Sequence, residues 1–119
     1  MTDLPASLPG IDVAAGLPRV AGNKKLYVKL LRHMAADAPS TREKLSAAVM
    51  NGDAKTVREI AHSLKGASAN LAATEVASVA ERLENAAKAD DFTALVTHLD
   101  ALETVLQQYV SVVGTLEGI

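Results

Sequence analysis

The stretch DAKTVREIAHSLKGASANLAA (residues 53–73) combines a helical apolar pattern with a histidine that lies outside that pattern. At about 100° per residue, the apolar and small side chains fall on one narrow arc of a helix. These are Val57, Ile60, Ala61, Leu64, Ser68 and Leu71. The pattern predicts a helix that buries one side against its neighbours. His62 lies far from the arc, so we expect its imidazole to face water.

The neighbours of His62 on the predicted helix are basic or small. Arg58 precedes it by one turn and Lys65 follows it by one turn. An exposed neutral imidazole is a nucleophile near neutral pH, and both cations disfavour a second positive charge on it. The same cations would stabilise a phosphoryl group bound to the ring. Gly66 costs the helix about 1 kcal/mol relative to alanine, but together with Ala69 it would let another protein approach closely.

A structural interpretation of these residues is also open at this point. An exposed histidine can be ordinary surface, a lysine can stand near it by chance, and Gly66 can serve helix packing. His33 and His98 lack the following lysine and glycine, so no phosphorylation is predicted for them. The three histidines belong to different predicted helices, so we expect no metal site.

The rest of the chain also predicts helices, because no run alternates between polar and apolar residues as a half-buried strand does. We expect Pro39 to end the first long helix and Asn51–Gly52 to end the second. Capping residues predict the helix starts, which follow Asp12, Asn23, Ser40 or Thr41, Asp53, Thr74, and Asp90 or Asp91. The predicted fold is all-α, an antiparallel up-down four-helix bundle with additional short N-terminal helices covering one end. Residues 1–10 are expected to be flexible and residues 11–119 to form one domain.

Composition excludes several functional classes. The 119 residues fit one compact domain, and the twelve Lys and Arg residues are dispersed in a chain of net charge −2, so no nucleic-acid partner is expected. The absence of cysteine excludes disulfides and thiolate chemistry. No apolar stretch reaches the roughly 18 residues that a membrane span needs, and the N-terminus lacks the pattern of a secretory signal. We expect no membrane contact and a cytoplasmic location. Glycine-rich nucleotide loops are absent, so no ATP-dependent kinase activity is expected.

The segment AHSLKGASANLAA (residues 61–73) resembles the H-x-x-K-G signature of histidine-containing phosphotransfer (HPt) domains. The segment LPGIDVAAGLPRVAGNKKLYVKLL (residues 8–31) resembles the beginning of such domains at the C-termini of hybrid sensor kinases. The resemblance covers about residues 8–116 and implies the four-helix bundle. It implies that His62 is the phosphoacceptor, Lys65 its charge partner and Gly66 the residue that gives clearance, and Asn70 matches an asparagine common in close relatives.

One position departs from the family pattern. Ala72 stands ten residues after the histidine, where the family often has glycine. Alanine is the smallest replacement for glycine and a better helix former, so we expect the substitution to affect only the local packing at the helix end.

The resemblance also implies a function and its partners. The chain would take a phosphoryl group from a receiver-domain aspartyl phosphate onto His62 and pass it to another receiver aspartate. The receiver would supply Mg²⁺, and this chain would need no cofactor of its own. We expect a monomer, either free-standing or part of a membrane-anchored hybrid sensor kinase. The receiver-binding surface should include Arg58, Gly66 and Ala69, whereas Tyr27, Leu31 and Met34 are expected in the core.

Two other classes of function remain as alternatives. A non-catalytic helical adaptor would bind a receiver or kinase domain and block it without needing His62. A bundle enzyme with a metal core is the other, and the lack of inward-facing Glu-x-x-His patterns speaks against it.

Overall fold

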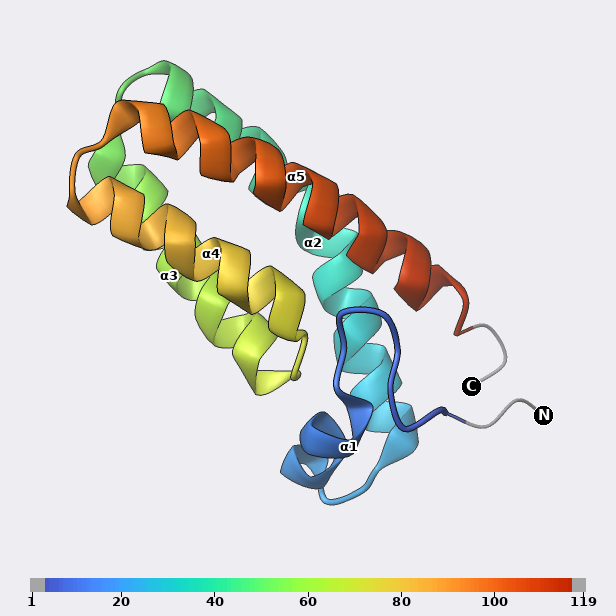
Figure 1. Ribbon diagram of the computed structural model, residues 1–119. Helices are drawn as coiled ribbons and strands as arrows, with labels where there is room; N and C mark the ends of the chain where they lie inside the picture. The colour runs from blue at the N-terminus through green and yellow to red at the C-terminus, as the bar shows by residue number, and fades with distance from the viewer. Residues whose placement is uncertain (1–3, 117–119) are drawn as a thin grey trace.

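Four long helices dominate the part of the chain, residues 4–116, that the computed structural model describes (Figure 1). A short helix α1 (Val13–Gly16) and a 3₁₀ turn η1 (Leu17–Val20) come first. They are followed by α2 (Lys24–Met50), α3 (Ala54–Asn70), α4 (Thr74–Lys88) and α5 (Phe92–Gly114). Each long helix packs against the next, and α5 returns to α2, which closes an antiparallel bundle. The prediction of an all-α, up-down four-helix bundle is confirmed.

Side-chain caps begin most helices where the sequence predicts them. The Oδ1 atoms of Asn23, Asp53 and Asp91 accept hydrogen bonds at 3.0–3.1 Å from backbone N–H groups three residues on, and Asp12 caps α1 in the same way. The prediction for α4 is wrong, because Thr74 is its first helical residue and Ala73 occupies the cap position without a side-chain bond. The hydroxyl of Thr74 instead donates to the carbonyl of Gly10 at 3.4 Å, so tertiary contact replaces the local cap.

Helix α2 continues through Pro39, so the predicted break and the separate helix from Ser40 or Thr41 are wrong. Proline removes one intrahelical hydrogen bond, here to the carbonyl of Ala35, and its ring crowds the preceding turn. Pro39 points to solvent, and buried residues on both sides of it pack into the core: Leu31, Met34, Ala38, Leu45, Ala48 and Val49. Burial of both halves against the bundle outweighs the local cost, and α2 changes direction as it passes behind α5 (Figure 1).

The N-terminal segment covers the end of the bundle that the shorter helices α3 and α4 do not reach (Figure 1). The Asp12 N–H donates to the Ala72 carbonyl at 2.9 Å, and Arg19 Nη1 donates to the Ala69 carbonyl at 2.6 Å. Gly16 allows this docking, because a Cβ atom there would overlap the ring and hydroxyl of Tyr27. Short N-terminal helices therefore cover one end as predicted, and they anchor the C-terminal end of α3.

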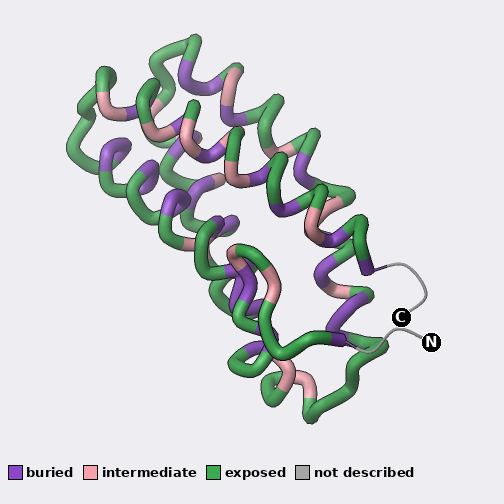
Figure 2. The backbone as a smooth tube through the Cα atoms, turned by 45° about the vertical axis from the view of Figure 1, so that its right-hand side comes forward, coloured by how far each residue is buried: buried purple, intermediate pink, exposed green. Residues whose placement is uncertain are grey.

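Buried residues lie on the inward sides of the helices, and exposed residues lie outside (Figure 2). Tyr27, Leu31 and Met34 are in this core, as predicted. Both buried tyrosine hydroxyls have partners, since Tyr27 donates to the Leu71 carbonyl and Tyr109 donates to the Leu31 carbonyl at 2.7 Å. Burial raises the pKa of each of these two hydroxyls. They remain neutral donors that tie α2 to the α3–α4 turn and to α5.

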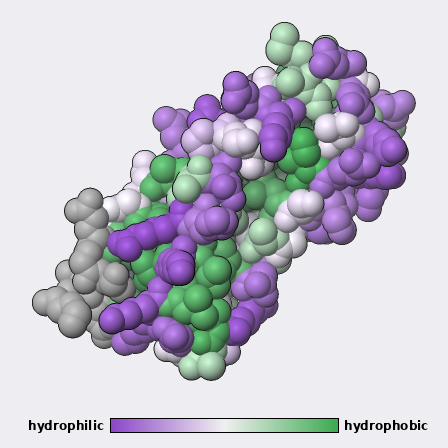
Figure 3. Space-filling view, turned by 180° about the vertical axis from the view of Figure 1, so that it is seen from behind, coloured by the Kyte–Doolittle hydropathy of each residue, from purple (hydrophilic) through white to green (hydrophobic). Residues whose placement is uncertain are grey.

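Apolar side chains reach the surface in separate patches between hydrophilic ones on the face seen in Figure 3. Among the large apolar residues, Leu26 in the first turn of α2 is 40% exposed. No helix among the described residues combines the length and apolar character needed to cross a membrane.

Ala72 lies beyond the end of α3, in the left-handed region with φ of 55°. The argument that alanine is a better helix former does not hold here, because helix propensity does not apply to a residue in this conformation. Glycine is favoured at such a C-terminal position, and alanine there costs roughly 1–2 kcal/mol of conformational strain. The hydrogen bond from Asp12 and the burial of Ala72 hold the turn in place.

The structure of α2 predicts the effect of Pro39→Ala. Alanine restores the hydrogen bond to Ala35, so we expect the free energy of unfolding to rise by about 1–2 kcal/mol, less than the full helix penalty because the unfolded chain also gains freedom. Urea unfolding followed by circular dichroism measures the change. A lower midpoint would contradict the prediction and would mean that the bundle requires the change of direction at Pro39.

Candidate functional site

His62 projects from the outward side of α3, and its side chain is 69% exposed. The opposite side of the helix is buried through Val57, Ala61, Leu64 and Ser68, and Ile60 is partly buried. Ser68 is satisfied within the core because its hydroxyl donates to the Leu64 carbonyl at 2.6 Å. The helical pattern thus predicted both the buried stripe and the exposed histidine correctly.

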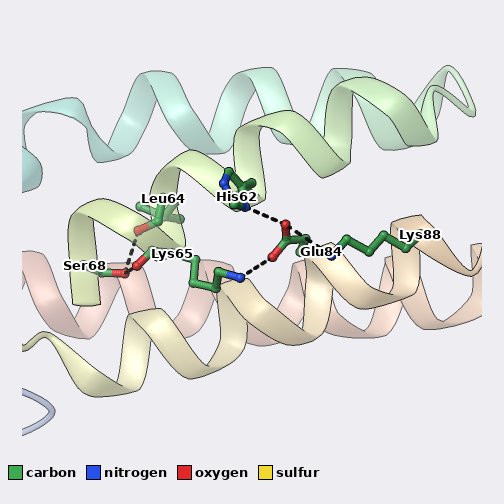
Figure 4. A network of polar contacts seen from close by, with 6 residues as sticks. All are labelled: His62, Leu64, Lys65, Ser68, Glu84 and Lys88. Atoms are coloured by element: carbon green, nitrogen blue, oxygen red, sulfur yellow. Dashed lines mark hydrogen bonds and ion pairs between the residues drawn. The ribbon is translucent and has the colours of Figure 1, made fainter. Parts of the chain in front are cut away.

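A buried carboxylate from the neighbouring helix holds the histidine ring (Figure 4). Glu84 of α4 has a side chain that is only 3% exposed, and its Oε2 lies 2.7 Å from Nδ1 of His62. Its other oxygen, Oε1, lies 2.7 Å from Nζ of Lys65 on α3. Lys88, one turn further along α4, places its Nζ 3.7 Å from Oε2. One carboxylate therefore gathers three basic groups from two helices.

The charge of Glu84 determines the tautomer of His62. The ammonium group of Lys65, 2.7 Å from Oε1, and the hydrogen bond from His62 lower the pKa of Glu84 to about 2, although burial opposes the shift. An ionised carboxylate only accepts hydrogen bonds, so Nδ1 of His62 is the donor. In a neutral ring, Nε2 then carries the free lone pair, and it lies on the side of the ring away from Nδ1. The site presents an oriented imidazole nucleophile at the protein surface.

Lys65 contributes to this site through Glu84. Its bond to the carboxylate raises the pKa of Lys65, which keeps the ammonium group charged at neutral pH. Its side chain is 31% exposed and runs toward Glu84 of α4 rather than straight into solvent (Figure 4). Its predicted role as charge partner of a phosphoryl group stays a prediction.

The other predicted site residues lie on α3 with His62, and within residues 4–116 they form no hydrogen bond or ion pair with Glu84. Arg58, Gly66 and Ala69 are all exposed. A Cβ atom added to Gly66 would meet no atom within 4 Å, so packing inside the molecule does not require this glycine. The open alternative that Gly66 serves helix packing is therefore excluded, and clearance for a partner remains its interpretation. The side chain of Asp37 lies 3.6 Å from exposed His33, an ordinary surface pair.

Sequence reasoning missed Glu84 and Lys88. On the helix of His62 itself, the nearest carboxylate in the sequence is that of Glu59, and it is exposed. A signal existed on α4: Glu84 directly follows the buried Leu83 and lies one turn after the buried Ala80. A carboxylate among core positions predicts a buried partner of opposite charge, but only the packing of α4 on α3 identifies that partner.

The family model described as "Hpt domain" matches residues 29–111. The crystal structure of histidine-containing phosphotransfer protein B (HptB) from Pseudomonas aeruginosa PAO1 is similar, with 28% sequence identity and a TM-score of 0.80 over 92% of this chain and 95% of that chain. No curated protein sequence matches at a significant level.

The lowered pKa of Glu84 predicts how stability depends on pH. Its stabilising contribution is complete above the ordinary pKa of 4.5 and is lost as the pH falls toward about 2, where the folded protein binds the proton. The difference in unfolding free energy between the wild type and Glu84→Gln should therefore be constant above pH 5 or so and shrink below it.

Unfolding by urea at a series of pH values measures this difference. Glu59→Gln, which removes an exposed carboxylate from α3, is the control and should leave the acid slope closer to that of the wild type. Parallel curves for the wild type and Glu84→Gln below pH 4.5 would show that the carboxylate gains nothing from its basic partners.

Proposed function

The chain belongs to the Hpt domain family, and from this premise we propose that His62 is the residue that carries the phosphoryl group. The protein is a histidine phosphotransfer intermediate of phosphorelay signalling, and Hpt domains interact with receiver domains in such relays. One observation supports the choice of His62 above all others. Its ring is exposed to a partner while a buried carboxylate fixes Nδ1 at 2.7 Å.

The proposed reaction is an in-line transfer between an aspartate of the receiver and Nε2. The lone pair on Nε2 forms the N–P bond, the acyl phosphate O–P bond breaks, and its electrons leave with the aspartate carboxylate. The ring becomes cationic and keeps its proton on Nδ1, where Glu84 accepts the hydrogen bond and stabilises the new charge. The reverse sequence passes the group to a second receiver. This chain supplies an oriented nucleophile and a fixed counter-charge.

We propose that the receiver supplies Mg²⁺ and that this chain holds no cofactor. Mg²⁺ prefers carboxylate and carbonyl oxygens, and both oxygens of the carboxylate at the ring, Glu84, face basic groups. The residues at His62 therefore do not fit a magnesium site of their own. We further propose a monomer, without nucleic-acid or membrane contacts, located in the cytoplasm because aspartyl-phosphate receivers are its partners. Arg58, Gly66 and Ala69 are proposed to lie in the contact with the receiver.

Phosphotransfer from a receiver charged with acetyl phosphate tests the site. We expect acid-labile, base-stable label on the wild type and on His33→Gln and His98→Gln, and none on His62→Gln, because only His62 combines exposure with a bound Nδ1. Persistence of label on His62→Gln would move the site elsewhere. Absence of label from every protein, combined with retained receiver binding by His62→Gln, would support the adaptor alternative.

The open space at Gly66 predicts opposite effects of substitution on stability and on transfer. Gly66→Ala and Gly66→Gln should each raise the free energy of unfolding by up to about 1 kcal/mol, because both are better helix formers and nothing crowds the position. Gly66→Gln should slow transfer from the receiver far more than Gly66→Ala, since its longer side chain occupies the space of the partner. Rapid-quench mixing with phosphorylated receiver measures the transfer rates of both variants. Equal rates for both variants would remove the clearance role.

A further inference from the structure

We propose that Lys88 is the cation that moves from Glu84 to the phosphoryl group once His62 carries it. This inference rests on the proposed function of His62 and adds a residue that the H-x-x-K-G motif does not contain. Lys88 lies on α4, a different helix from the motif, and it reaches Glu84 from the side opposite to Lys65 (Figure 4).

The two lysines at Glu84 are held differently. Lys65 approaches Oε1 to 2.7 Å and is 31% exposed, so its ammonium is committed to the buried carboxylate. Lys88 approaches Oε2 only to 3.7 Å and is 53% exposed. It also shares that oxygen with the His62 ring, whose Nδ1 is closer at 2.7 Å. Lys88 therefore loses a weaker ion-pair interaction than Lys65 would when it moves away from Glu84.

The position of Lys88 brings its charge to the ring. Its Nζ and the Nδ1 of His62 both lie within 4 Å of the same oxygen atom. A phosphoryl group on Nε2 adds up to two negative charges on the exposed side of this small ring. The flexible four-carbon stem of a lysine allows the ammonium group to follow that charge without movement of the backbone.

Departure of Lys88 leaves the carboxylate compensated. Glu84 keeps Lys65 on Oε1, and the phosphorylated ring, which is cationic with its proton on Nδ1, replaces the lost charge beside Oε2. No bond is made or broken in this step. In the phosphorylated protein, Lys65 and the charged ring thus stay beside the buried carboxylate, and Lys88 adds a cation beside the phosphoryl group.

The test uses phosphorylated protein without a receiver, so that docking cannot contribute. Phosphoramidate labels exposed histidines, and the ³¹P resonance of His62 is the one that His62→Gln lacks. Lys88→Ala should move the titration midpoint of this resonance to higher pH, by about 0.5 of a pH unit, because a cation near the dianion favours its ionised form. Lys88→Arg, which keeps the positive charge, should have the midpoint of the wild type. Arg82→Ala, which removes an exposed cation from the same helix, should leave it unchanged.

Equilibrium transfer gives a second readout. With a receiver present, Lys88→Ala should shift the distribution of phosphoryl groups toward the receiver by about threefold relative to Arg82→Ala. Equal midpoints and equal equilibria for Lys88→Ala and Arg82→Ala, with unchanged thermal unfolding, would overturn the inference. A His62 resonance missing from the wild type would instead contradict the proposed function, so the two failures are distinguishable.

Discussion

The burial of one ionised carboxylate is the constraint on which the site depends. Removing Glu84 from water is costly, and the cost is offset because basic groups from both α3 and α4 converge on it. Those groups reach it only when the two helices pack in one register. The orientation of His62 therefore depends directly on how α4 packs against α3. A displaced α4 would leave a buried charge without partners, and it would release the ring that the charge orients.

Contacts with the N-terminal part of the chain hold the C-terminal end of α3 in place. Arg19 and Tyr27 donate to the carbonyls of Ala69 and Leu71, groups that the end of a helix leaves without intrahelical partners. These bonds satisfy the helix terminus and fix it against α2 and η1. The surface around Gly66 lies between this anchored end and His62. The low helix propensity of Gly66 is therefore tolerated without loss of order in α3.

Local sequence signals predicted the fold well where one residue and its nearest neighbours determine the outcome. Asn23, Asp53 and Asp91 cap helices because a short polar side chain can always reach the N–H group three residues on. The same kind of reasoning failed at Pro39, Thr74 and Ala72. At each of these positions contacts with distant parts of the chain outweigh a local preference of 1–3 kcal/mol or so.

The sequence by itself determined that the chain is helical, that His62 faces water and that small residues flank it, because helical periodicity decides which side of a helix each residue occupies. Only the tertiary structure decided what touches the ring. Glu84 is 22 positions away in the chain, and its distance to Nδ1 depends on how α4 packs on α3. The protonation of Nδ1, the commitment of Lys65 and the looser hold on Lys88 all follow from that one packing contact. Charge interactions of this kind act through space, and no spacing of residues on a single helix can reveal them.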